Sequence, residues 1–181
     1  MSENRDENFR SVKSWLSSPR RLKQVGIAIR QAIDSVIDAV RTRRYRIDDL
    51  DRIEEAYLVD RVQHEIIFHW GLELESLSCA KVNDVCVCVK FGVCGSWKFA
   101  IQDVGKLCVL VTVSDDTSTY SVGLFRAIPE YIGSKQRTDK GKRSISKIGR
   151  QRIDWISMND KLPVNFLPHQ IKEARSRLLA H

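Results

Sequence analysis

The side chains best suited to chemistry gather in one short run of the sequence, residues 85–91, which reads VCVCVKF. Alternating residue types are typical of a β-strand, whose successive side chains point to opposite faces. The run therefore places the thiols of Cys86 and Cys88 on the same face as the ammonium group of Lys90. This face offers no oxygen ligand to Mg²⁺, which demands oxygen in near-octahedral geometry, whereas thiolates suit softer metals.

Four of the five cysteines lie in this strand-rich part of the chain: Cys79, Cys86, Cys88 and Cys94. An odd number of cysteines in a chain without a signal peptide favours reduced, buried thiols over a disulfide framework. Zinc binding by these cysteines with His64 or His69 is an alternative, but the spacing lacks a Cys-x₂₋₄-Cys knuckle. Nucleophilic catalysis by Cys88 with Lys90 or His64 lacks triad-like spacing.

Two helices are predicted before any strand. Apolar residues recur at helical spacing from Pro19 to about Val40, and a second helix is predicted from Asp48 or Asp49 to about His69. The second helix should turn these residues inward: Leu50, Ile53, Tyr57, Val62 and Ile66. Residues 1–18 are polar and mixed in charge, so we expect a flexible arm that is ordered only near Phe9, Val12 and Trp15, followed by one domain over 19–181.

The strands follow the helices. Five are predicted, over residues 72–79, 85–91, 97–101, 106–114 and 118–128, with a hairpin turn at Asn83-Asp84. Trp97 is expected in the core. A further helix is predicted around 146–157, with Ile148 and Trp155 inward, and a last polar helix after Pro168.

Positive charge is distributed unevenly over a chain whose net charge is +7. Between residues 135 and 152 the only acid is Asp139, and a second basic group closes the first long helix. The first group is Lys135, Arg137, Lys140, Lys142, Arg143, Lys147, Arg150 and Arg152, and the second is Arg41, Arg43, Arg44 and Arg46. One such run is usually a solvated face, but two runs with so few acids favour a polyanionic partner.

No stretch is apolar enough to span a bilayer, and the first residues lack the apolar core of a signal peptide. We therefore expect a protein of the bacterial-type cytosol, associated with the nucleoid and not with a membrane.

Several short blocks, in order and nearly without gaps, resemble the endonuclease domain of NaeI-type restriction enzymes. They include residues 41–42, 49–50, 87–91, 105–110, 114–115, 123–124, 128–129, 149–150, 161–162 and 165–167. The resemblance implies a restriction-endonuclease-like (PD-(D/E)xK) α/β core, a mixed β-sheet flanked by helices. It also implies a homodimer that acts on double-stranded DNA with Mg²⁺, in a restriction-modification setting.

The metal site of that family uses a helical Glu, an Asp on a hairpin strand, and an Asp-x-Lys pair on the next strand. Counted back from Lys90 without gaps, the three acids fall on Gln63, Cys79 and Cys88. The resemblance therefore implies a pseudoenzyme with a degenerate site, because hydrolysis needs anionic oxygens to hold the ion. Acids that could substitute are Glu65, Glu73, Glu75 and Asp84.

The expected function is binding of specific or modified double-stranded DNA by a homodimer that does not cut and needs no cofactor. Lys90 is expected to meet a phosphate as a bare cation. The remaining candidate DNA contacts are Lys98, Lys135, Gln136, Arg137, Lys140, Lys142, Arg143, Lys147, Arg150, Arg41, Arg43 and Arg44. One alternative is an active Mg²⁺-dependent endonuclease with relocated acids, and another is a subunit that only dimerises with an active partner. The chain ends where larger family members begin a second DNA-binding domain, so effector-site behaviour is not expected.

Overall fold

The computed structural model describes residues 2–37, 42, 44, 46–76, 79–133 and 141–164. The helices are α1 (Ser2–Leu16), α2 (Pro19–Ile37), α4 (Arg52–His69) and α5 (Lys147–Arg150), with 3₁₀ turns η1 (Ile47–Asp49) and η2 (Ile101–Asp103). The strands are β1 (Leu74–Ser76), β2 (Cys79–Val82), β3 (Val85–Val93), β4 (Lys98–Phe99), β5 (Leu107–Ser114), β6 (Thr119–Arg126), β7 (Arg143–Ser144) and β8 (Asp154–Lys161).

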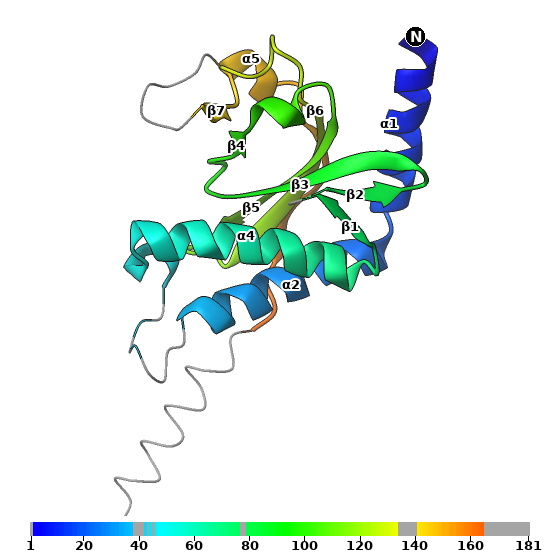
Figure 1. Ribbon diagram of the computed structural model, residues 1–181. Helices are drawn as coiled ribbons and strands as arrows, with labels where there is room; N and C mark the ends of the chain where they lie inside the picture. The colour runs from blue at the N-terminus through cyan, green and yellow to red at the C-terminus, as the bar shows by residue number, and fades with distance from the viewer. Residues whose placement is uncertain are drawn as a thin grey trace, which may run out of the picture.

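A mixed six-stranded sheet organises the molecule, in the order β1-β2-β3-β5-β6-β8. Strands β3 and β5 are parallel, whereas the other neighbours are antiparallel. The predicted turn at Asn83-Asp84 is confirmed: both residues have positive φ, as a tight hairpin turn requires. Strands β4 and β7 form a separate pair that lies with α5 at one end of the molecule (Figure 1).

The helices α2 and α4 pack side by side and cover one face of the sheet (Figure 1). Helix α4 begins after Asp51, whose carboxylate accepts hydrogen bonds from the backbone N–H groups of Ile53 and Glu54 at 2.8 and 2.9 Å. Such an N-cap satisfies donors that the first turn of a helix otherwise leaves unpaired. Both predicted helices are confirmed over the described residues. No described helix is long and apolar enough to cross a membrane.

The N-terminal segment differs from its prediction. Residues 2–16 form the helix α1, where we expected a flexible arm ordered only near Phe9, Val12 and Trp15. Val12 and Leu16, four residues apart on one helix face, are fully buried. Trp15 packs edge to face on Trp70, with ring centroids 5.2 Å apart. These contacts with the rest of the fold stabilise a helix whose own composition is too polar to predict it.

The segment after the basic region also differs. The helix predicted around 146–157 is limited to α5, and residues 154–161 form the strand β8 beside β6. Three residues predicted to face inward are exposed: Ile53 at 81%, Tyr57 at 58% and Ile148 at 59%. Trp97 is in the core, as predicted, at 2% exposure. The helix predicted after Pro168 lies outside the described residues.

Candidate functional site

The two faces of β3 differ in chemistry, as its alternating sequence predicts. Val87, Val89 and Phe91 pack into the core beneath the helices. Cys88 belongs to a second cluster on the opposite face, together with Cys79, Cys108 and Leu110 and with aromatic residues. The residues that could do chemistry are therefore held on the sheet face that α2 and α4 do not cover.

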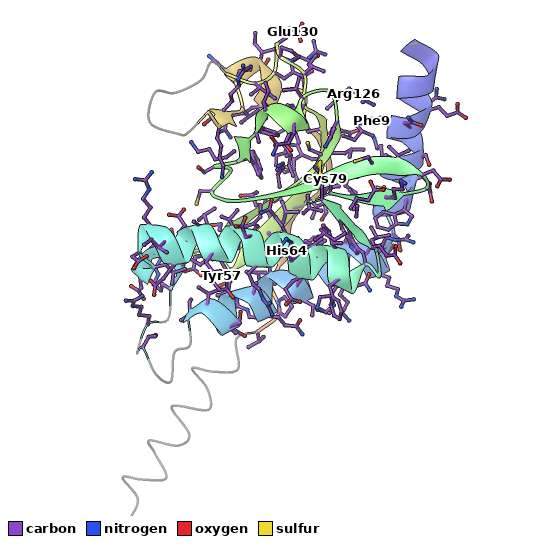
Figure 2. The ribbon with its side chains drawn as sticks, viewed as in Figure 1. Phe9, Tyr57, His64, Cys79, Arg126 and Glu130 are labelled. Carbon is purple, nitrogen blue, oxygen red and sulfur yellow. A yellow bond between two sulfur atoms is a disulfide. The ribbon has the colours of Figure 1, made fainter. Side chains whose placement is uncertain are left out.

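Cys79 and Cys88 form a disulfide, with an S–S distance of 2.10 Å. The prediction of reduced thiols is wrong for this pair, because the antiparallel register of β2 and β3 places the two residues directly opposite each other. Their Cα atoms lie 4.0 Å apart. Figure 2 shows Cys79 within the sheet, away from Tyr57 and His64 on α4.

Two further cysteines flank this disulfide. Cys86, two residues before Cys88 on the same strand face, is half-buried, and its sulfur lies within 4.8 Å of those of Cys79 and Cys88. Cys108 on β5 stands in register with Cys88 and is fully buried. Burial raises the pKa of the Cys108 thiol to about 12, because desolvation penalises the thiolate. Cys108 is therefore an inert core residue, as predicted.

Lys90 is paired with a buried acid that the sequence analysis did not identify. Its Nζ lies 2.7 Å from Oδ2 of Asp103, and the two side chains are 11% and 3% exposed. The backbone N–H of Ala100 donates to the same oxygen at 2.6 Å, which fixes the carboxylate in the turn η2. The expectation that Lys90 is a bare cation is therefore wrong. A signal was present, since a lysine in a buried strand needs an acid and Asp103 is the only one between residues 91 and 114.

Gln63 is buried in α4 at 6% exposure, but the structure does not group it with the two cysteines. Its amide donates to the carbonyl of Val59 at 3.0 Å, one turn earlier in α4. Helix α4 packs on the face of the sheet opposite to Cys79 and Cys88. The four degenerate positions therefore separate into a disulfide, an ion-paired lysine, and an amide held by its own helix.

The four acids that could substitute for the missing ones are placed elsewhere. Glu65 pairs with Arg61 at 2.7 Å, and Glu75 pairs with Lys81 at 2.8 Å. Glu73 and Asp84 are exposed. Within the described ranges, the only group of three or more His, Cys, Asp or Glu residues whose ligand atoms converge is Cys79, Cys86 and Cys88.

Five of the predicted DNA contacts come from β4, β7, α5 and the residue before β7. We call these the basic patch: Lys98, Lys142, Arg143, Lys147 and Arg150. No acid occurs between residues 141 and 153, where five basic residues stand. Lys98 donates to Ser144 at 3.2 Å across the β4–β7 pair. Lys142, Lys147 and Arg150 are exposed.

The remaining predicted contacts divide into two groups. Arg44 forms an ion pair with Glu54 near the start of α4, so its charge is already offset. The others lie outside the described residues: Arg41, Arg43, Lys135, Gln136, Arg137 and Lys140.

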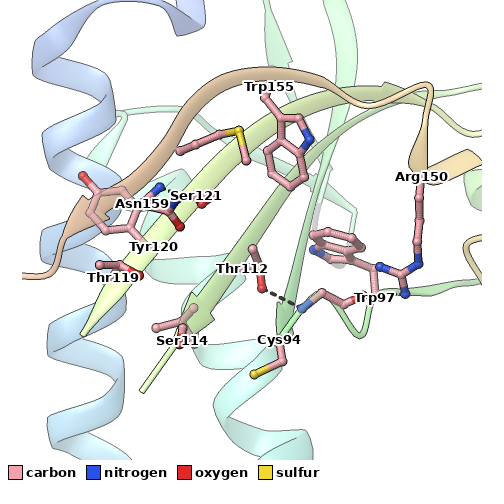
Figure 3. A pocket seen from close by; sticks show the side chains of 13 residues that line it. Cys94, Trp97, Thr112, Ser114, Thr119, Tyr120, Ser121, Arg150, Trp155 and Asn159 are labelled. Atoms are coloured by element: carbon pink, nitrogen blue, oxygen red, sulfur yellow. Dashed lines mark hydrogen bonds between the residues drawn. The ribbon is translucent and has the colours of Figure 1, made fainter. Parts of the chain in front are cut away.

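A cavity of about 270 Å³ is lined in part by Arg150 of the basic patch (Figure 3). Trp97, Trp155 and Arg150 line it together with the ends of β5 and β6. The guanidinium of Arg150 donates to the carbonyl of Gly95 at 3.1 Å and lies 5.7 Å from the ring centre of Trp97. Gly95 donates in turn to Thr112 at 2.7 Å, the hydrogen bond drawn in Figure 3. The sequence alone does not indicate this cavity, because its lining comes from five separate segments.

A mixed sheet with a β2–β3 hairpin, a parallel β3–β5 neighbour and flanking helices defines a restriction-endonuclease-like core. The family model described as restriction endonuclease NaeI matches residues 17–181, and the chain belongs to this family. The chain is similar to the type II restriction enzyme NaeI of Lentzea aerocolonigenes, with 26% identity over 184 aligned positions. The alignment covers 97% of this chain and 56% of the relative, so the chain spans just over half the length of that enzyme.

Proposed function

We propose that this chain binds double-stranded DNA as a homodimer and does not hydrolyse it. The observation that carries the proposal is the disulfide between Cys79 and Cys88, at the two positions where the family resemblance expects the strand aspartates. A disulfide supplies neither the negative charge nor the oxygen atoms that Mg²⁺ requires.

The neighbouring residues do not fit Mg²⁺ either. Gln63, at the position of the helical acid, directs its amide to a carbonyl of its own helix. The carboxylate nearest to Lys90 is that of Asp103, which is already neutralised by that lysine. Because no three carboxylates converge among the described residues, these residues do not fit a hydrolytic Mg²⁺ site.

The basic patch supports binding of a polyanion. Phosphate contacts fix the position of a protein on DNA and supply most of its salt-dependent affinity. Lys142, Lys147 and Arg150 present exposed positive charge within a stretch that contains no acid. Lys90 is not included in the proposed surface, because Asp103 offsets its charge.

The test is fluorescence anisotropy with duplexes selected from random DNA, methylated and unmethylated, over a range of salt concentrations. The log–log slope should be steep, about −0.9 for each phosphate neutralised. The double variant Lys142→Ala/Lys147→Ala should reduce the magnitude of this slope by about two, because two phosphate contacts are lost. Lys23 is an exposed lysine on α2, and Lys23→Ala should leave the slope unchanged. A slope near zero for the unmodified protein would exclude DNA as the partner.

Helix α4 carries a surface suited to the proposed homodimer. Ile53, Tyr57 and Phe68 fall on one helix face and are 81%, 58% and 75% exposed. Burying these three side chains against a second copy would remove apolar surface from water, although exposed Arg61 and His64 lie between Tyr57 and Phe68 on the same face. Light scattering should give twice the chain mass for the unmodified protein and a shift towards the monomer for Phe68→Glu. A mass of one chain at all concentrations would contradict this part of the proposal.

One observation favours a second candidate, an active endonuclease with relocated acids. Asp103 is a buried carboxylate 2.7 Å from Lys90, the residue at the family's catalytic lysine position. If this pair served hydrolysis, supercoiled plasmid would be cut with Mg²⁺ or Mn²⁺, and Asp103→Asn and Lys90→Ala would each abolish cleavage. Our proposal expects no cleavage above that of a mock preparation.

A further inference from the structure

Three sulfur atoms converge on the sheet face opposite to α2 and α4. The Sγ atoms of Cys79, Cys86 and Cys88 all lie within 4.8 Å of one another. We infer that, once the Cys79–Cys88 disulfide is reduced, these three residues bind a thiophilic d¹⁰ metal ion such as Cu⁺ or Zn²⁺. The site is independent of the proposed DNA binding, because its ligands are not part of the basic patch.

The backbone already supplies the geometry of such a site. Cys79 and Cys88 are held opposite each other by the β2–β3 ladder, and Cys86 lies two residues from Cys88 on the same face. A zinc–sulfur bond of about 2.3 Å in tetrahedral geometry separates two sulfur ligands by about 3.8 Å. The three sulfurs therefore need only side-chain rotation, and not movement of the strands, to surround an ion.

The donor atoms select the class of metal. Thiolates favour soft ions, and the group contains no carboxylate or imidazole that would favour a hard ion. The ammonium of Lys90, two residues beyond Cys88, would repel a cation if it were alone. Its ion pair with Asp103 is neutral overall, which removes that repulsion.

Access to the site is through Cys86. Cys79 and Cys88 are 4% and 0% exposed, whereas Cys86 is half-buried and near the hairpin turn. An ion would meet Cys86 first, and a water molecule at this open side could complete a four-coordinate zinc site.

Formation of the site requires a chemical step. A dithiol reductant supplies two electrons and two protons, the Cys79–Cys88 bond breaks to give two thiols, and the reductant becomes a disulfide. Each thiol that then binds the ion releases one proton. The oxidised chain keeps two of its three sulfurs in a bond and should not bind the ion.

The experiment compares the reduced and the oxidised full chain. After anaerobic treatment with dithiothreitol and its removal, the protein is titrated with Cu⁺ or Zn²⁺ in separate series, and bound metal is measured per chain after gel filtration. We expect one ion per reduced chain and none for the oxidised chain, with Mg²⁺ as a negative control. Loss of a supporting partner already weakens metal affinity about 10- to 100-fold, so Cys86→Ser should weaken it by at least about 100-fold.

Cys94→Ser is the matched control, because Cys94 is exposed and outside the sulfur group. It should bind the ion as the unmodified chain does. A second readout needs no variant: bound metal should protect Cys86 from iodoacetamide, measured by mass spectrometry, while Cys94 stays reactive. Absence of bound metal in the reduced chain would overturn the inference, as would full affinity in Cys86→Ser or equal alkylation of Cys86 with and without the ion.

Discussion

The two faces of the central sheet are built from the same strands and yet have different chemistry. The face under α2 and α4 is packed with aliphatic residues such as Val89, Val111 and Leu124. The opposite face holds the disulfide, the Lys90–Asp103 pair and buried tryptophan. The first face is stabilised by apolar burial, whereas the second also depends on individual bonds between named partners. Single substitutions should therefore act by different mechanisms on the two faces.

The largest effect is expected from breaking the ion pair on the second face. Lys90→Ala leaves the carboxylate of Asp103 buried and unpaired, which should destabilise the fold by about 3–5 kcal/mol. The measurement is urea unfolding followed by circular dichroism. The double substitution Lys90→Met/Asp103→Leu removes both charges and should recover most of the loss. If the double variant is as unstable as Lys90→Ala, packing and not charge pairing is the reason for the loss.

The next effect concerns the disulfide. Cys79 and Cys88 are separated by nine positions in the sequence, and closing a loop of this length stabilises a fold by about 2–3 kcal/mol in the chain-entropy account. Reduction should lower the urea midpoint of the unmodified chain accordingly. Cys79→Ser/Cys88→Ser should be insensitive to reductant, and Cys94→Ser should respond as the unmodified chain does. An unchanged midpoint after verified reduction would mean that the β2–β3 ladder holds the hairpin without the bond.

A smaller loss of stability is expected at two neighbouring residues of β5 whose side chains point to opposite faces of the sheet. Val111→Thr places a hydroxyl in the apolar core and should cost about 1–3 kcal/mol. Thr112→Val removes the acceptor of the buried Gly95 N–H, so this change should also destabilise, by about 1–2 kcal/mol. Thermal unfolding of both variants tests the comparison. A gain in stability for Thr112→Val would show that the second face tolerates apolar residues as readily as the first.

Much of this comparison could be predicted from the sequence. The alternation in residues 85–91 correctly separated valines from cysteines and Lys90, because side-chain direction in a strand depends on period alone. The helices α2 and α4 were equally evident from their spacing. The strand β8 was not evident from the sequence, since the residues near Trp155 and Ile156 are apolar on both faces and fit the helical and the strand period equally.

The site was harder to predict because it depends on partners from distant segments. The pairing of Cys79 with Cys88 follows from the two-residue turn at Asn83-Asp84, which sets the register of the hairpin, although the cysteine count alone does not indicate it. The partner of Lys90 is on a turn beyond β4, and its position depends on how the chain returns across the sheet. Sequence periodicity identified the face of Lys90, but only the fold identified Asp103 as its partner.

The smallest effect tests Tyr120, a buried tyrosine on the sheet face that α2 and α4 cover. The hydroxyl of Tyr120 donates to the carbonyl of Leu22 in α2 at 2.9 Å. Desolvation, with a smaller contribution from Asp160, raises the pKa of Tyr120 from 10.0 to about 12. The unfolded chain therefore loses this proton at lower pH than the folded chain does. The resulting stability is fully present below pH 10 and is lost as pH rises towards 12.

Unfolding by urea at intervals across this pH range should show a fall in stability that Tyr120→Phe lacks. At neutral pH, the free energy of unfolding of Tyr120→Phe should be lower by about 0.5–1.5 kcal/mol, because one hydrogen bond is removed without leaving a buried donor. Comparing the two proteins at each pH cancels the titration of lysines, which both contain. If the two proteins lose stability with pH in parallel, the Tyr120 hydroxyl is solvated. Water would then reach the helix-covered face of the sheet despite its aliphatic composition.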